Sequence, residues 1–463
     1  MRSTLPTFNE VWQQHFRQSV LTQLQQLPSQ ARLIVACSGG LDSLLLLYVL
    51  AALCPQRLFV VHIDHQLQKA SGTWAKLVEQ QCLALNLPYR IVPVCVAQQG
   101  NLEANARSAR QQAFYNELHA GDVLVFAHHQ QDQAETVMLR LLSGAGVQGL
   151  AAMRLWEQRA QPFSHFIYRP FLTLSRSQLQ TWADHLQLPY VHDPMNDDVH
   201  YDRVWCRQVL WNVLEQRFPK MQHAIARTSQ IMHDADEILH EVAMQDWASC
   251  GDKNHLNIQQ LQQFRLARQR QILSLWMKGD DDYRPSFDKV QRLFDEVIHA
   301  KIDAQSCLYF NQFYYVRYAD TLYRYHQQQW QQFQQSPSAF TFCPTLGINL
   351  HLATGVFTLQ SGQKIGLSSQ LIGQQLSIKN RQDGLKLRLY QRQGAKSLKK
   401  FLQEQNIEPW RRLGVQFLYV QEQLLGVFTP KQFYIVASDW LEQDGWLPVL
   451  GQNNRLNEGE HDE

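Results

Sequence analysis

The sequence predicts an α/β protein with an amino-terminal doubly wound parallel sheet, a helical region after it, and a small α+β domain near the carboxyl end. Three observations lead to this prediction. From residue 31 to about 215, short β-rich runs alternate with helical segments, which is typical of a parallel sheet with helices on both faces. Residues from about 218 to 335 carry mainly helical patterns. After Pro344, short alternating runs are separated by glycines, as in antiparallel strands.

Size and composition agree with such an organisation. The 463 residues suffice for two to four domains, and 45% apolar with 18% charged residues is typical of a globular protein. The formal net charge of +2 means that any surface for nucleic acid must be local. We expect a cytoplasmic protein with no membrane segment, because no apolar run is long enough and no signal pattern opens the chain. The eight cysteines show no CxxC spacing, so we expect buried thiols and neither disulfides nor a metal site.

The first predicted strand ends in the most informative motif of the chain. The apolar run of residues 33–36 is followed at once by Ser-Gly-Gly-Leu-Asp-Ser and then by a long apolar helix. A glycine turn between a strand and a helix presents backbone N–H groups at a positive helix N-terminus, and this arrangement binds phosphate. A carboxylate at Asp42 would repel phosphates unless a cation intervened, so we expect Mg²⁺ there. The predicted phosphate-binding residues are Ser38, Gly39, Gly40, Leu41, Asp42 and Ser43.

This motif resembles the loop of the N-type ATP pyrophosphatases, the PP-loop superfamily, which have a Rossmann-like fold and cleave ATP between the α and β phosphates. No lysine follows the glycines, so the loop is not of the Walker type. The alternative is a Ser/Gly-rich turn without a ligand. The six-residue pattern in this context favours ATP.

The next elements place further polar groups near the loop. Runs 58–63, 89–96 and 123–127 are predicted strands, and runs 71–85 and 102–119 are predicted helices. Residues 62–65 (His-Ile-Asp-His) end the second strand and so face the crevice where ligands of such folds bind. On the second helix Arg107 and Arg110 lie three apart on one face and could clamp a phosphate, although spacing alone fits a solvated basic face equally well.

A third polar group follows the strand at 123–127. His128, Asp132 and Glu135 have the spacing i, i+4 and i+7, which predicts one stripe at the start of the next helix. A histidine beside two carboxylates could move protons, hold Mg²⁺ or bind an amine. A lone histidine would usually be structural, but three such groups at the end of a strand favour function.

The remainder of the chain gives boundaries rather than chemistry. The Gln-rich stretch 326–335 and Ser336-Pro337-Ser338 suggest a linker. Short strands are expected at 357–359, 375–379, 385–389, 417–420, 426–429 and 434–437. We therefore expect a catalytic domain at 1–215, a helical domain at 216–335, a terminal α+β domain at 350–447 and a disordered tail at 451–463.

Several motifs in order resemble the tRNA(Ile)-lysidine synthetases, a family within that superfamily. Besides the loop, they are HIDH at 62–65, NLEANAR…AR at 101–110, HHQQDQAET at 128–136, SGAGVQGLAAM at 143–153, YRPFL at 168–172, DPMNDD…YDR at 193–203 and QDGLKLRL…KSLKKFLQEQNIEPWRR at 382–412. Four positions depart from the family pattern. Gln131 stands where an Asp is usual, Ser143 where an Arg is usual, Val204 where an Asn is usual, and Gln111 replaces an aromatic residue.

The resemblance implies a reaction and its participants. The O2 atom of the wobble cytidine of tRNA(Ile) with a CAU anticodon would attack the α-phosphate of ATP, and free lysine would then displace AMP to give lysidine. This carbon–nitrogen ligation changes the codon read from AUG to AUA. Asp42, His128, Asp132 and Glu135 are the expected catalytic residues, ATP and Mg²⁺ the cofactors, and a homodimer is suggested. Arg107 and Arg110 join the ATP site, and Asp64, His65, Arg203 and Arg207 are expected to bind substrate.

The resemblance implies that the domains at 216–335 and 350–447 bind tRNA, and contacts are expected from a local basic surface of the terminal domain. The expected residues are Lys386, Arg388, Lys396, Lys399, Lys400, Arg411 and Arg412, interspersed with Tyr390, Phe401 and Trp410. Positive charge with aromatic rings suits structured RNA, and the resemblance implies the acceptor end. Without the resemblance, an ordinary solvated basic face would explain the same residues.

Other functions of the same loop fit less well. A tRNA thiolation enzyme would need a persulfide cysteine or paired CxxC motifs, and the cysteines here are scattered. An amidotransferase such as a GMP synthetase would need a glutaminase domain or partner. A catalytically silent RNA-binding protein would not need the intact loop and the stripe from His128 to Glu135.

Overall fold

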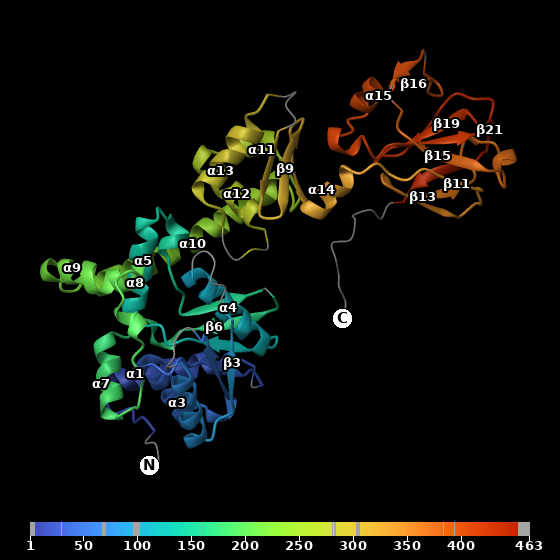
Figure 1. Ribbon diagram of the computed structural model, residues 1–463. Coiled ribbons are helices and arrows are strands. Elements are labelled where there is room, and N and C mark those ends of the chain that lie inside the picture. Colours follow the sequence, from blue (N-terminus) through green and yellow to red (C-terminus); the bar gives the residue numbers. More distant parts are fainter. Residues whose placement is uncertain are drawn as a thin grey trace. The chain divides into compact units, whose positions relative to one another are not determined.

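The computed structural model describes residues 5–28, 30–66, 71–95, 102–160, 162–279, 281, 284–301, 306–382, 384–392 and 394–451, without the side chains of 102–104 and 196. The chain forms two compact units (Figure 1). The first comprises residues 1–246 and 274–284, and the second comprises residues 247–273 and 285–463. Among the described residues, no helix combines the length and apolar character that a membrane span requires.

A six-stranded sheet forms the centre of the first unit. Its order is β3-β2-β1-β4-β6-β5, and every neighbouring pair is parallel except the edge pair β5–β6. The strands are β1 (Leu33–Ala36), β2 (Leu58–Asp64), β3 (Tyr89–Pro93), β4 (Val123–Val125), β5 (Trp156–Arg159) and β6 (His165–Tyr168). The first four overlap the predicted strands, so the predicted doubly wound parallel sheet is confirmed.

Helices cover both faces of this sheet. One face packs against α1 (Val11–Gln25), α2 (Leu41–Leu53), α3 (Ser71–Ala84) and α7 (Arg176–His185) in the largest core cluster. The opposite face packs against α4 (Leu102–Glu117) through Phe114 and Leu118. Residues 44–50 of α2 are all buried, which explains why this helix is apolar on every side.

The rest of the first unit is helical. The elements are η1 (Pro55–Arg57), α5 (Gln130–Leu142), α6 (Val147–Leu150), η2 (Pro170–Thr173), η3 (Pro194–Asp197), α8 (Asp202–Trp205), the π-helix η4 (Cys206–Leu210), α9 (Trp211–Arg217) and α10 (Met221–Cys250). Ala134 of α5, Cys206 of η4 and Trp211 of α9 share one buried cluster. This packing brings the segment around residue 205 against the helix that carries the predicted polar stripe.

The second unit begins with helices and a sheet. The helices are α11 (Ile258–Gln262), α12 (Leu266–Lys278), whose residues 274–278 belong to the first unit, α13 (Phe287–Leu293), the π-helix η5 (Phe294–Ile298) and α14 (Gln327–Phe333). An antiparallel sheet of order β7-β10-β9-β8 accompanies them, made of β7 (His255–Asn257), β8 (Cys307–Phe310), β9 (Phe313–Tyr318) and β10 (Thr321–His326). The helices were expected, whereas this sheet was not. The Gln-rich stretch expected as a linker forms α14.

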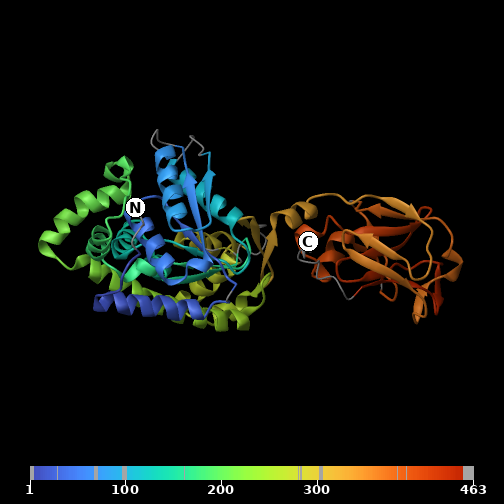
Figure 2. The same ribbon diagram turned by 90° about the horizontal axis from the view of Figure 1, so that it is seen from below.

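The remaining strands of the second unit are antiparallel, as expected (orange to red in Figure 2). They are β11 (Phe340–Phe342), β12 (Asn349–Leu352), β13 (Gly355–Gln360), β14 (Ile365–Leu367), β15 (Leu376–Asn380), β16 (Lys386–Leu387), β17 (Lys396–Ser397), β18 (Gln416–Val420), β19 (Gln423–Phe428), β20 (Phe433–Ile435), β21 (Leu441–Gln443) and β22 (Leu447–Leu450). Between them lie η6 (Ser369–Leu371), α15 (Leu398–Glu404) and η7 (Pro409–Arg411). The predicted tail lies outside the described residues from position 452 on.

One expectation about the cysteines is wrong. Five of the eight are buried, but Cys95, Cys307 and Cys343 are exposed. All eight are free thiols. Composition could not distinguish these three positions, because a cysteine at the surface has the same spacing as one in the core.

Candidate active site

The predicted phosphate-binding loop lies between β1 and α2. Gly40 is the N-cap of α2, and the loop is closed by its serines. The Ser43 hydroxyl accepts the Ser38 N–H at 3.1 Å and donates to the Gly40 carbonyl at 3.0 Å. The Ser38 hydroxyl in turn accepts the Gly40 N–H at 3.3 Å. The serines thus fix the loop, while the first N–H groups of α2, which no helical carbonyl can satisfy, remain oriented toward a ligand.

Gly39 has the one conformation in this loop that demands glycine. Its φ is +87°, and a Cβ there would lie 3.4 Å from both Val78 and Val191. Its carbonyl accepts the Val191 N–H at 3.0 Å. Gly40 is different, since its φ is −75° and the nearest atom to an added Cβ would be the Ser38 hydroxyl at 3.5 Å.

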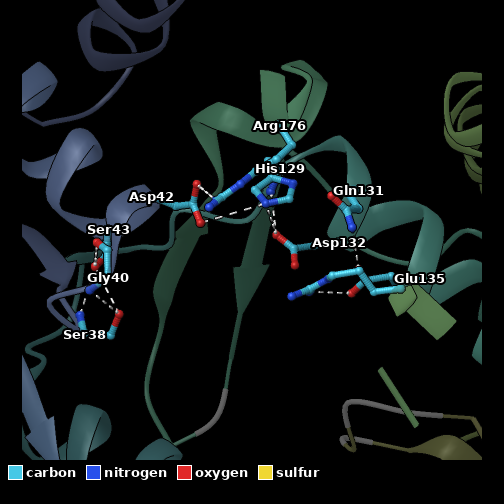
Figure 3. Close-up of polar contacts among 10 residues, drawn as sticks. Ser38, Gly40, Asp42, Ser43, His129, Gln131, Asp132, Glu135 and Arg176 are labelled. Atoms are coloured by element: carbon cyan, nitrogen blue, oxygen red, sulfur yellow. Dashed lines mark hydrogen bonds and ion pairs between the residues drawn. The ribbon is translucent and has the colours of Figure 1, made fainter. Parts of the chain in front are cut away.

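Asp42 is the second residue of α2 and has two cationic or ionisable neighbours. Arg176, the first residue of α7, forms an ion pair with it (Figure 3). The His129 Nε2 atom lies 3.9 Å from its other carboxylate oxygen. Arg176 was not among the predicted site residues. Its position in YRPFL…SR gave no signal of its own, because the contact depends on α7 packing against α2.

His129 and Asp132 form the start of α5. Asp132 accepts the His129 N–H at 2.9 Å as part of a capping box, and the His129 Nε2 lies 3.5 Å from the same carboxylate oxygen. Burial opposes ionisation of Asp132, but the backbone hydrogen bond from His129 and the charge of Arg203 favour it, and the pKa of Asp132 is lowered. Asp42, His129 and Asp132 therefore form a continuous polar chain from the loop to α5 (Figure 3).

His128, the first residue of the predicted stripe, does not lie on the helix. The helix α5 begins at Gln130, so His128 precedes it and is not on the helix. Burial lowers the pKa of His128, and the charges of Arg169, Arg203 and Arg110 act in the same direction. Its imidazole is therefore neutral, and its Nδ1 has no hydrogen-bond partner among the described residues. Because its pKa is lowered, the ring is a weak proton acceptor and serves as a neutral polar group of the site.

Glu135 lies deeper than Asp132. Its side chain is fully buried, and Arg207 binds it with two hydrogen bonds, Nε to Oε1 at 2.9 Å and Nη2 to Oε2 at 3.2 Å. The Gln131 amide also donates to Oε1, at 3.2 Å. Burial raises the pKa of Glu135, while the Arg207 hydrogen bonds oppose this.

The two arginines expected to bind substrate enter from the segment α8–η4. Arg203 lies with its guanidinium 3.4 Å from the Thr136 hydroxyl, and Arg207 lies within the π-helix η4. π-Helical turns often occur at functional sites. The structure thus brings Arg203, Arg207, Asp132 and Glu135 together from residues that are about 70 positions apart in the sequence.

The residues at the end of β2 lie at the same edge. His62 is buried, and its Nδ1 is 2.8 Å from the Cys37 carbonyl at the end of β1. Asp64 accepts the Gln66 N–H at 2.9 Å. Burial and the nearby charge of Arg110 lower the pKa of His65, which places Arg110 beside this strand end. Arg107, one turn away on α4, is exposed.

Mg²⁺ fits this set of donors. A magnesium ion in a nucleotide site usually takes one or two carboxylates and completes its shell with phosphate and water. Asp42 supplies one carboxylate beside the helix N-terminus, and its side chain is 28% exposed. Among the described residues no three His, Cys, Asp or Glu side chains form a metal cluster.

The predicted tRNA-binding residues differ in solvent exposure and in the contacts that their side chains make. Lys386, Arg388, Lys399 and Lys400 are exposed. Lys396 is bound to Glu404 at 2.8 Å. Arg411 and Arg412 are half-buried, and Arg412 donates to the Ile407 carbonyl. Of the interspersed aromatic residues, Phe401 belongs to the core and cannot contact RNA.

Comparisons with known proteins cover most of the chain. Residues 12–214 match the PP-loop domain, residues 256–323 the TilS substrate binding domain, and residues 376–440 the TilS substrate C-terminal domain. A tRNA(Ile)-lysidine synthase of Acinetobacter baylyi is 49% identical over 97% of this chain and 97% of its own length. One of Legionella pneumophila is 34% identical over 85% and 90%. The solved structure of the U34-tRNA thiolase NcsA from Methanococcus maripaludis covers 49% of this chain and 81% of its own, with 18% identity and a TM-score of 0.39.

Proposed function

The chain belongs to the tRNA(Ile)-lysidine synthase family, and from this premise we propose that it joins lysine to C2 of the wobble cytidine of tRNA(Ile) with the CAU anticodon, at the expense of ATP. The observation that carries the proposal is the polar chain from the phosphate-binding loop to α5, in which Asp42 faces Arg176 and His129. This chain of contacts supports a nucleotide site and a set of proton-handling groups at one edge of the sheet.

In the first step, the cytidine O2 attacks the α-phosphorus of ATP and pyrophosphate leaves. The loop from Ser38 to Ser43 holds the leaving group with backbone N–H groups and hydroxyls. Mg²⁺, held by Asp42, would neutralise charge on the phosphates. Mg²⁺ bound at Asp42 would replace the ion pair between Asp42 and Arg176. The Arg176 guanidinium would then be able to bind a phosphate oxygen.

In the second step, the lysine Nζ attacks C2 of the adenylated cytidine, the C2–O2 bond breaks and AMP leaves with that oxygen. Lysine is cationic at neutral pH, so its ammonium must be bound and deprotonated. Asp132, Glu135 and His128 are the groups that we propose hold the lysine ammonium or assist the attack. The charges of Arg110 and Arg203 both act on His128. We propose that these two arginines bind the phosphate of the departing AMP.

Recognition of tRNA is proposed for the second unit and for the regions expected at 216–335 and 350–447. The exposed lysines and arginines of the terminal region support it, namely Lys386, Arg388, Lys399 and Lys400. We also propose that the protein works in the cytoplasm, where ATP, lysine and tRNA are present, and that it forms a homodimer.

The test is a labelling experiment. The purified protein is incubated with ATP, Mg²⁺, radiolabelled lysine and a tRNA(Ile) transcript with the CAU anticodon. Parallel reactions contain the elongator methionine tRNA or the variant Asp42→Ala. Label should enter the isoleucine tRNA alone and should be lost in the variant.

Two results would contradict the proposal. Label in the methionine tRNA would refute the proposed substrate. AMP release that depends on tRNA without incorporation of lysine would keep adenylation but refute lysine as the nucleophile.

A further inference from the structure

Glu135 is a buried carboxylate held by donors from two directions. Arg207 approaches from η4 with two hydrogen bonds, and Gln131 approaches from the preceding turn of α5 with one. The carboxylate itself is completely buried, whereas Arg207 is 38% exposed. The position of the arginine therefore depends on how firmly the carboxylate is held.

The contact from Gln131 follows from helix geometry. Residues 131 and 135 are one turn apart on α5, so their side chains lie on one face. A glutamine is long enough to bring its amide to Oε1, and the distance is 3.2 Å. Figure 3 shows the Gln131 amide directed at Glu135, on the side of the site where Asp132 also lies.

The charges around Glu135 come from three elements. Arg207 and Arg203 contribute positive charge from η4 and α8, Asp132 contributes negative charge from α5, and the buried thiol of Cys206 lies nearby. Burial and the charge of Asp132 raise the pKa of Glu135, and each donor to its oxygens favours the ionised form. A neutral donor at residue 131 stabilises the ionised carboxylate of Glu135 and adds no charge next to Asp132.

We propose that Gln131 is a positioning residue, whose amide fixes the Glu135 carboxylate so that Arg207 stays directed into the active site. A carboxylate at residue 131 could not donate this hydrogen bond and would repel both Asp132 and Glu135. The glutamine thus gives this chain a site with two carboxylates on the stripe and a fixed counter-ion, instead of three carboxylates in competition for the same arginines.

The activity part of the test rests on the proposed function. Gln131→Met removes the donor at nearly constant volume, and Gln131→Glu replaces it with an acceptor that carries charge. Gln112→Met is the matched control, because Gln112 also donates to a residue one turn away, Asn116 on α4, at 3.1 Å but on the exposed surface. Each variant is assayed for lysine incorporation between pH 5.5 and 8.5, and each is also made in a Glu135→Gln background.

The acid limb of the kcat profile should move to higher pH by about one unit in Gln131→Met and by more in Gln131→Glu, since a carboxylate that loses a donor is protonated more easily. Gln112→Met should match the wild type. In the Glu135→Gln background the substitutions at 131 should have no further effect on the profile. An unchanged profile in Gln131→Met, or the same shift without Glu135, would overturn the proposal.

A second measurement does not depend on the reaction. Urea unfolding of the wild type, Gln131→Met, Glu135→Gln and the double variant gives the coupling between the two side chains. The effect of Gln131→Met should be clearly smaller in the Glu135→Gln background, and additive effects would contradict the inference. If Glu135→Gln does not fold, Glu135→Asp replaces it. A wild-type protein that incorporates no lysine would refute the proposed function, and the unfolding cycle would then decide on Gln131 alone.

Discussion

At the scale of single residues, His62 joins the second strand to the phosphate-binding loop. Its Nδ1 is 2.8 Å from the carbonyl of Cys37, the residue just before the loop, and since a carbonyl can only accept, the ring donates from Nδ1. Only 3% of His62 is exposed. Burial lowers its pKa below the usual value, although the hydrogen bond acts in the opposite direction. The histidine is therefore a neutral structural link beneath the loop.

This link makes stability depend on pH. Because the pKa of His62 is lower in the folded state, the unfolded state binds more protons below pH 6.5, and stability falls as the pH decreases from there toward the folded pKa. One such group contributes a slope of up to about 1.4 kcal/mol per pH unit. Urea unfolding at pH 7.5, 6.5 and 5.5 should therefore show a shallower decline for His62→Gln than for the wild type. Parallel declines would mean that His62 does not carry this effect, since His65 and His128 are present in both proteins.

Single residues also show where sequence reasoning stopped. The loop residues and Asp132 could be found because strand, turn and helix signals are local. Arg176 could not be found, because it reaches Asp42 only through the packing of α7 against α2, 134 positions away in the sequence. The prediction for His128 assumed a helix that already included residue 128, whereas the capping box at His129 makes α5 start at Gln130, two residues later.

At the scale of elements, the loop between β1 and α2 offers a comparison of two neighbouring glycines. Gly39 has a positive φ and close contacts to two valines, whereas Gly40 has a φ that any residue adopts. Gly39→Ala should therefore lower the free energy of unfolding by about 1–2 kcal/mol through backbone strain. Gly40→Ala should leave it nearly unchanged. Denaturant titration of both variants gives the answer, and equal losses would contradict the role of φ.

The lysines in and next to helix α15 allow a similar comparison for the basic surface. Lys399 and Lys400 are exposed, while Lys396 is engaged by Glu404. Lys399→Ala or Lys400→Ala should weaken tRNA binding and reduce the salt dependence of log Kd by roughly one unit, the effect of one lost phosphate contact. Lys396→Ala should have a smaller effect. Filter binding at several salt concentrations distinguishes these outcomes, and three identical salt slopes would exclude α15 from the tRNA surface.

Elements with strong local signals were predicted best. The strands β1 to β4 and the helices α3 and α4 overlap the predicted runs, since a buried parallel strand is a continuous apolar run and the helices carry a clear period. The sheet β7-β10-β9-β8 was missed. Its strands are rich in tyrosine and lie among helices, and its first strand is separated from the other three by about 50 residues, so only tertiary packing reveals it.

At the scale of the whole molecule, Trp410 of the terminal region of the second unit contacts this unpredicted sheet. The Trp410 ring of η7 lies 5.4 Å from the Tyr323 ring and 6.1 Å from the Tyr325 ring of β10. It also lies 5.9 Å from the Trp330 ring of α14. The sequence suggested Trp410 as an RNA-stacking residue, but its ring is engaged by these contacts. A linker at 334–339 without regular structure connects the two regions, so the aromatic cluster restricts how they move.

Loss of the Trp410 ring should raise the KM for tRNA more than the KM for ATP. Each aromatic pair contributes about 0.5–1.5 kcal/mol, so Trp410→Ala removes enough to free the terminal region from the sheet. A tRNA bound by both regions then pays the entropy of ordering them, and its KM should rise about tenfold while the KM for ATP stays constant. Trp410→Phe keeps an aromatic ring at this position, so its KM for tRNA should stay close to that of the wild type. Limited proteolysis supplies an independent measure, because the linker at 334–339 should be cleaved faster in Trp410→Ala. A raised KM for ATP, or an unchanged rate of cleavage, would show that Trp410 acts on the fold in general and not on the union of the two regions.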